Sequence, residues 1–234
     1  MDYYDAYAAR MNAKGASKRD VKKNNTERMY DRKIRNSPTS ASYLLDDTPT
    51  LAIVSYEKRS NPFTTQQTFQ RTFQFESTAK ASLGSVISDD ENTYIIYDKS
   101  DIDILPPYYA LKTNDVLDIE FEPMQIDTGR KDGIGRPIYE TIELPDLKLD
   151  CFVTENARVS ESADFNNRPV VLPEGRLNVL ISNPNQEIEL GKIVELSIGK
   201  YKVLGVNKLN ANGTKGYITL LIDNMQAALM RTGE

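Results

Sequence analysis

The sequence predicts a mainly β protein, with a small β-barrel or β-sandwich body behind a helical N-terminal extension. From Leu51 onward, apolar residues alternate with polar ones at the two-residue period of a strand. Turn-forming residues separate these runs at short intervals, and no long apolar helical pattern follows the first 36 residues. Many short strands without a central helix are typical of all-β barrels and sandwiches.

The 234 residues are expected to form four segments. Residues 1–36 are predicted to be a basic helical arm, and residues 37–50, rich in Ser, Thr and Asp, a linker. Residues 51–165 are predicted to form a β-rich body. Residues 166–234 are predicted to form a C-terminal β module. Both β groups are compatible with small barrels.

The predicted strands are short. Phe69, Phe73 and Phe75 show the pattern best, because polar residues stand between them as on a strand with one wet face. Residues 210–216 are predicted to be a hairpin between the last two strands. The runs with strand character are residues 51–56, 68–75, 94–97, 116–121, 139–144, 147–154, 177–181, 193–198, 201–206 and 217–222.

The composition excludes most recognisable catalytic chemistry. Histidine is absent and Cys151 is the only cysteine, so one chain cannot build a Cys/His zinc site, a serine–histidine triad or a cysteine–histidine pair. Cys151 lies in an alternating run and is interpreted as a buried strand thiol. Residues 98–103 are acidic but lack the spacing and the glycine of a calcium-binding loop. We therefore expect no catalytic residue, no metal and no cofactor.

Targeting signals are also missing from the sequence. The N-terminus has no basic segment followed by an apolar core, and no stretch approaches the ~20 apolar residues that span a bilayer. A lone cysteine cannot form an internal disulfide. We expect a soluble protein, made in a reducing compartment, without membrane contact.

Charge is distributed unevenly along the chain. Residues 1–36 contain ten basic and five acidic side chains, a net charge of +5, within a chain of net charge −5. The remaining 198 residues therefore carry −10. A basic arm attached to an acidic body favours contact with an acidic partner surface.

The N-terminal arm is the main candidate for a functional element. Its first part has apolar residues at helical spacing, and a second helix is predicted at residues 18–35, with Ser17 and Asp20 placed as in a capping box. The arm is interpreted as a docking element, and the alternatives are a solvated extension and a DNA-binding element. The candidate docking residues are Tyr3, Tyr4, Tyr7, Arg10, Met11, Lys18, Arg19, Lys22, Lys23, Arg28, Arg32 and Lys33.

A glycine-rich basic segment at residues 128–137 is the second candidate. It has neither the spacing of a phosphate-binding loop nor that of a dinucleotide-binding loop. It is interpreted either as a hairpin tip in solvent or as a basic loop that projects toward a nucleic acid or a protein partner. The residues concerned are Gly129, Arg130, Lys131, Asp132, Gly133, Gly135 and Arg136.

The order of elements carries a family resemblance. A charged helical extension with Asp2-Tyr3-Tyr4-Asp5, Arg10 and Gly15 precedes a β body, which ends in a strand, a hairpin and a strand at residues 199–206 and 216–222. This layout resembles the neck proteins of tailed bacteriophages, the head-completion or stopper connectors between portal and tail. The resemblance implies a homo-oligomeric ring of β barrels in the virion, synthesised in the host cytoplasm.

The resemblance also implies the partners. These are a portal or adaptor ring and tail proteins, with non-specific contact to packaged DNA in a channel that the ring lines or closes. Residues 128–137 would then face the channel or a partner. Two alternatives to this non-enzymatic structural role are a tail or baseplate protein and a nucleic-acid-binding module that uses the basic arm. An enzyme acting through paired carboxylates is the least favoured interpretation, because no motif supports it.

Overall fold

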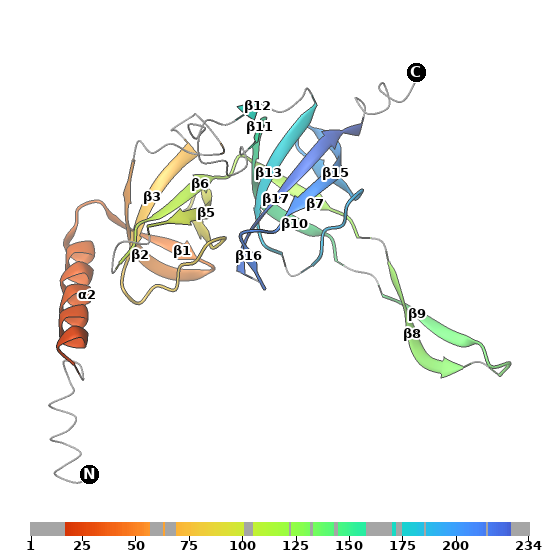
Figure 1. Cartoon of the computed structure of the whole chain (residues 1–234), viewed down its shortest axis with the longest axis horizontal. Helices are drawn as coiled ribbons and strands as arrows, with labels where there is room; N and C mark the ends of the chain where they lie inside the picture. The colour runs from red at the N-terminus through yellow and green to blue at the C-terminus, as the bar shows by residue number, and fades with distance from the viewer. Residues whose placement is uncertain are drawn as a thin grey trace, which may run out of the picture.

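Two β barrels lie side by side, with a helix at one end of the molecule and a long β ribbon at the other (Figure 1). The computed structural model describes residues 17–56, 63, 69–100, 105–121, 123–131, 133–142, 145–157, 170–171, 175–184, 186–213 and 215–225. The helix is α2 (Lys18–Asn36). The predicted mainly β fold with a helical N-terminal extension is confirmed. The two barrels do not coincide with the two predicted β groups, because strands of the first group also contribute to the second barrel.

The N-terminal barrel has the strand order β1-β2-β3-β6-β5-β4 and is closed by pairing of β1 with β4. Its core contains Phe73 and Phe75, two of the alternating phenylalanines, together with Ala52, Ile87 and Ile96. The alternation therefore directs one face of β3 inward, as the sequence predicts. The strands are β1 (Ser40–Leu45), β2 (Thr48–Ser55), β3 (Gln70–Phe75), β4 (Val86–Ser88), β5 (Thr93–Lys99) and β6 (Tyr108–Lys112).

The C-terminal barrel has the order β13-β10-β7-β14-β15-β17 and is closed by pairing of β13 with β17. Its core is mainly aliphatic and includes Leu117, Val179, Leu220 and the thiol of Cys151. A short strand, β16 (Ala211–Asn212), lies in the predicted hairpin before β17. The barrel strands are β7 (Asp115–Ile119), β10 (Leu147–Thr154), β13 (Arg176–Ser182), β14 (Ile193–Leu196), β15 (Gly199–Asn207) and β17 (Lys215–Asn224).

Aromatic side chains from both barrels form the seam between them. Phe63 lies edge-on to Tyr97 of the first barrel and Tyr217 of the second, with ring centroids 5.8 and 6.3 Å apart. Phe152 and Leu180 of the second barrel belong to the same buried cluster. Edge-to-face aromatic contacts add to the free energy of burial, so the seam holds the barrels together as one body.

Two further pairs of strands lie outside the barrels. The ribbon consists of β8 (Met124–Lys131) and β9 (Pro137–Ile142), inserted between β7 and β10. The strands β11 (Asn156–Ala157) and β12 (Val170–Val171) pair with each other between β10 and β13.

The linker predicted at residues 37–50 is wrong, because these residues contain β1 and the start of β2. Asp46 and Asp47 form the two-residue turn between the strands, with φ angles of 46° and 64°. Positive φ at both central residues is characteristic of hairpin turns whose twist matches that of the flanking strands. Aspartate tolerates positive φ better than most residues do. A segment rich in Ser, Thr and Asp therefore forms a hairpin, since Tyr43 and Leu45 pack into the barrel core.

The predicted boundary between residues 165 and 166 is also wrong. Strand β7 pairs with β10 and β14, so the second barrel already begins at Asp115. Proline and glycine between residues 169 and 175 suggested a boundary, but they lie within the sequence of the second barrel, between β10 and β13.

Candidate docking surfaces

Helix α2 begins where the sequence predicts. Ser17 is the N-cap residue: its hydroxyl oxygen accepts a hydrogen bond from the backbone N–H of Asp20, at 3.2 Å. The Ser17 hydroxyl in turn donates to the Asp20 carboxylate, at 2.8 Å. These contacts satisfy an otherwise unpaired donor in the first turn and place an acidic group at the positive end of the helix dipole.

The last two turns of α2 attach it to the first barrel. The Asp31 carboxylate accepts hydrogen bonds from the backbone N–H and the hydroxyl of Ser77, at 2.8 and 2.7 Å. Arg35 Nε donates to Glu76 Oε1 at 2.7 Å, and this hydrogen bond raises the pKa of Arg35. Ile34 is the buried residue of the helix. The preceding turns extend away from the barrel (Figure 1).

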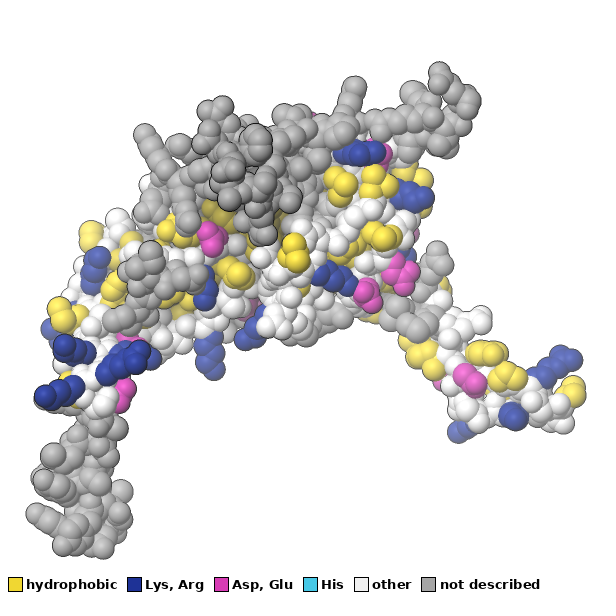
Figure 2. Space-filling model, in the orientation of Figure 1, with side chains coloured by type: hydrophobic (Ala, Val, Ile, Leu, Met, Phe, Trp, Pro, Cys, Tyr) yellow, Lys and Arg dark blue, Asp and Glu magenta, His cyan; other side chains and the backbone are white. Residues whose placement is uncertain are grey.

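The exposed surface of α2 is strongly basic. The helix contains eight basic and three acidic residues, and basic side chains gather over it in Figure 2. Two of the lysines have contacts within the helix: Lys23 pairs with Glu27, and Lys33 lies over the ring of Tyr30. All the predicted docking residues on α2 are exposed, namely Lys18, Arg19, Lys22, Lys23, Arg28, Arg32 and Lys33.

The other predicted docking residues cannot be placed. Tyr3, Tyr4, Tyr7, Arg10 and Met11 lie outside the described residues. Within the described residues, the candidate docking surface on α2 consists of its exposed cations.

The predicted glycine-rich segment forms the distal half of the ribbon and its turn. Gly129, Arg130 and Lys131 end β8, whereas Gly133, Gly135 and Arg136 lie between the strands; Asp132 is outside the described residues. Gly129 and Gly135 have φ angles of 68° and 87°, which glycine adopts without strain. The Thr128 hydroxyl donates to the Ile138 carbonyl at 2.7 Å and bridges the irregular pairing there.

One face of the ribbon carries three isoleucines, with the charged Glu140 among them. Antiparallel pairing places Ile126 opposite Glu140, and Ile138 and Ile142 alternate onto the same face. The three isoleucines are between 41% and 44% exposed, and Ile134 at the turn is 81% exposed. Sequence analysis did not identify this stripe, because its residues are isolated among polar neighbours. Figure 2 shows hydrophobic side chains along the ribbon and basic ones toward its tip.

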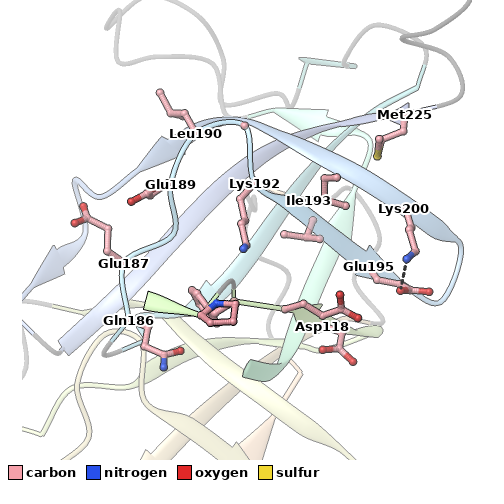
Figure 3. Close-up of a pocket in the computed structure, with 15 residues that line it drawn as sticks. Asp118, Gln186, Glu187, Glu189, Leu190, Lys192, Ile193, Glu195, Lys200 and Met225 are labelled. Carbon is pink, nitrogen blue, oxygen red and sulfur yellow. Dashed lines mark ion pairs between the residues drawn. The ribbon is translucent and has the colours of Figure 1, made fainter. Parts of the chain in front are cut away.

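A cleft in the second barrel was not predicted either. Its volume is about 1120 Å³, and we call it the acidic cleft (Figure 3). Glu187 and Glu189 lie on one side, and Asp118 and Glu195 on the other. The pairing of Glu195 with Asp118 across β14 and β7 brings together acidic residues that are far apart in sequence. The other acidic lining residue is Glu120.

Several acids of the cleft have basic neighbours. Lys148 Nζ lies 2.8 Å from Asp118 Oδ2, and this hydrogen bond raises the pKa of Lys148. Lys208 Nζ lies 2.6 Å from Glu187 Oε1, and that hydrogen bond lowers the pKa of Glu187. Asp118 Oδ1 and Gln186 Oε1 are buried without a hydrogen-bond partner within the described parts of the chain. Buried acceptors of this kind are costly unless a donor reaches them.

Cys151 is a structural residue, as predicted. Its side chain is buried in the core of the second barrel. Burial, with smaller contributions from Asp115 and Asp150, raises the pKa of the thiol well above its usual range. The thiol of Cys151 therefore stays protonated, and the reactive thiolate form is disfavoured.

Comparison of the chain with family models, curated proteins and solved structures gave no match. Across the described ranges, no helix has both the length and the apolar composition needed to cross a membrane.

Proposed function

We propose that this chain is a non-enzymatic structural protein of a tailed-phage virion, part of the neck between portal and tail. The two barrels would form the body of each subunit in a ring around the DNA channel. Helix α2 would dock on the neighbouring ring. The observation that carries this proposal is α2 itself: a capped basic helix, attached to the body by its last two turns, with its cations in solvent.

The electrostatics of the chain support docking through α2. Charged rim residues steer association and fix the orientation of partners more than they add affinity. A helix with five more basic than acidic residues is suited to an acidic ring surface. The body, net negative in the sequence after residue 36, would let DNA pass through the channel without strong binding.

The position in the virion can be tested directly. Gold-labelled antibodies against the chain, applied to purified particles of the phage that encodes it, are expected to mark the junction of head and tail. Label at the tail tip would favour the baseplate alternative. Particles without label, in a preparation whose known capsid protein is labelled, would refute a virion role.

The docking helix can be tested by complementation. A lysate from cells infected with a phage whose gene for this chain is disrupted should form tailed particles again when the full chain is added. The variant Lys18→Glu/Lys22→Glu/Arg28→Glu should restore far fewer particles. The matched control is Lys80→Glu/Lys202→Glu/Lys215→Glu, because these lysines are exposed and lie on the barrels. Equal restoration by the two variants would exclude α2 as the docking element.

The same exposed cations of α2 favour a second candidate function, the binding of nucleic acid. A module that binds phosphates through α2 would bind duplex DNA with an affinity that falls steeply with salt. Reversal of charge at Lys22, Lys23, Arg32 and Lys33 would then abolish binding. DNA binding that survives this change would exclude the helix as the DNA contact.

A further inference from the structure

No described part of the chain outside the ribbon covers its exposed side chains. An isolated two-stranded ribbon is only marginally stable in water, and three or more strands or a packed face are usually needed. By the strand rise, β8 extends about 25 Å, and every side chain described in β9 is exposed. Its isoleucine face, formed by Ile126, Ile138 and Ile142, therefore lacks the packing that such a face normally has.

The acidic cleft has the complementary character. Five acids and two lysines, Lys192 and Lys200, line it, so its lining is net negative, although Lys200 pairs with Glu195 at 3.5 Å. Exposed apolar side chains lie among them, of which Leu190 is 68% exposed and Ile193 is 47% exposed. Its volume of about 1120 Å³ exceeds the range usual for small-molecule pockets, about 300–1,000 Å³. Asp118 Oδ1 and Gln186 Oε1 are buried acceptors that an incoming donor would satisfy.

The tip of the ribbon supplies matching groups. Residues 128–137 contain three basic side chains and one acidic side chain, and Ile134 stands exposed at the turn. Arg130 and Lys131 are exposed at the end of β8. A basic tip with an apolar apex thus matches an acidic cleft with apolar walls in both respects.

The ribbon projects away from the cleft of its own chain. Phe121 and Pro123, where the chain passes from β7 into the ribbon, line the edge of the cleft. From there the ribbon runs outward from both barrels (Figure 1). We propose that the tip of the β8–β9 ribbon of one copy inserts into the acidic cleft of a second copy.

This contact would be heterologous, because tip and cleft are different surfaces of one chain. Each copy then offers one tip and one cleft, and successive copies close into a ring when the rotation between them permits. This contact would join neighbouring copies in the ring of the proposed function, and it rests on that proposal. It does not require a particular position in the virion.

Charge exchange between two variants of the full chain provides the test. In Arg130→Glu/Lys131→Glu, an acidic tip meets the natural acidic cleft. In Glu120→Lys/Glu189→Lys, the natural basic tip meets a basic cleft. Each variant alone is expected to associate at least about tenfold more weakly than the natural chain in sedimentation velocity, since like charges oppose docking. An equimolar mixture of the two restores association, because both of its alternating contacts join opposite charges.

The control replaces exposed charges outside both surfaces, as Lys80→Glu/Lys215→Glu, and is expected to associate as the natural chain does. A natural chain that stays monomeric at high concentration overturns the proposal. So do single variants that associate normally, or a mixture that associates no better than its components. Thermal melts of each variant report folding separately.

The geometry can be checked by cross-linking. Ile134→Cys at the tip, mixed with Leu190→Cys in the cleft, should give disulfide-linked heterodimers under mild oxidation. The control partner is Leu209→Cys, which is 85% exposed in the loop after β15. Equal yields with both partners would overturn the assignment of the cleft. These measurements contain no phage component, so their failure is distinct from a failure of the labelling experiment.

Discussion

The seam between the barrels and the β8–β9 ribbon use glycine in opposite ways. A Cβ atom added at Gly84 would lie 1.7 Å from the carbonyl oxygen of Gly216 in the other barrel, so backbone meets backbone at the seam. A Cβ added at Gly129 or Gly135 in the ribbon would meet nothing within 4 Å. The seam is fixed by close packing within the chain, whereas the ribbon glycines have open space around them.

The largest effect is expected from Gly84→Ala. The side chain would overlap the backbone of Gly216, and φ at Gly84 is +80°, so no small adjustment relieves the clash. We expect the free energy of unfolding to fall by more than about 4 kcal/mol, a loss that is otherwise seen only for severe packing defects. Urea unfolding would measure it.

Gly129→Ala is the matched control for that substitution. Its φ of +68° also disfavours alanine, but its Cβ would be in open space. We expect about 1–2 kcal/mol of local strain in the ribbon and little change in barrel unfolding. Equal destabilisation by both substitutions would mean that backbone conformation, not crowding, governs the seam.

The next largest effect is expected from Phe152→Ala. This buried ring faces the seam cluster and lies edge-on to Phe69 at 5.6 Å. Its removal should cost about 3–5 kcal/mol, as for other buried phenylalanines. Tyr139→Ala in the ribbon, where the ring is exposed, should cost little. Similar unfolding midpoints for the two variants would contradict the description of the seam as packed core.

Local alternation predicted most of the seam's strands, but not the seam itself. Phe73 and Phe75 reveal a buried face because strand period and burial are both local properties. Gly84 and Gly216 meet only after both barrels close, and nothing near either residue in sequence marks the other. The acidic cleft likewise depends on β7 pairing with β14, which joins residues 118 and 195.

Hairpin β1–β2 shows a different limit of sequence analysis. Its Ser and Thr residues have linker composition, and only two of its six β1 side chains, Tyr43 and Leu45, belong to the core. The pairing that makes β1 a strand comes from β2 and β4, so composition alone could not predict it. The cap of α2 was predictable because Ser17 and Asp20 interact within one turn.

A smaller effect is expected from Asp31→Ala, which tests the attachment of α2. The substitution removes two part-buried hydrogen bonds to Ser77, which together should contribute about 1–3 kcal/mol, because water partly replaces them. Because the helix is otherwise exposed, the loss should appear as faster amide hydrogen exchange over residues 27–36, with the barrels unchanged. Asp90→Ala, at an exposed loop position, is the control. Unchanged exchange would show that Ile34 and Arg35 hold the helix without Asp31.

The smallest effect on folding is expected from Ile138→Ser in the ribbon. The side chain is 42% exposed and lies on the isoleucine face, so its replacement should change the free energy of unfolding of the monomer by less than about 0.5 kcal/mol. Association of copies should nevertheless weaken, because the same side chain would be buried in the cleft of the next copy. Tyr139→Ser, on the opposite face, should leave association closer to normal. A loss of folding stability as large as that of Phe152→Ala would show that the isoleucine face is already covered by its own chain, and the contrast between ribbon and seam would then disappear.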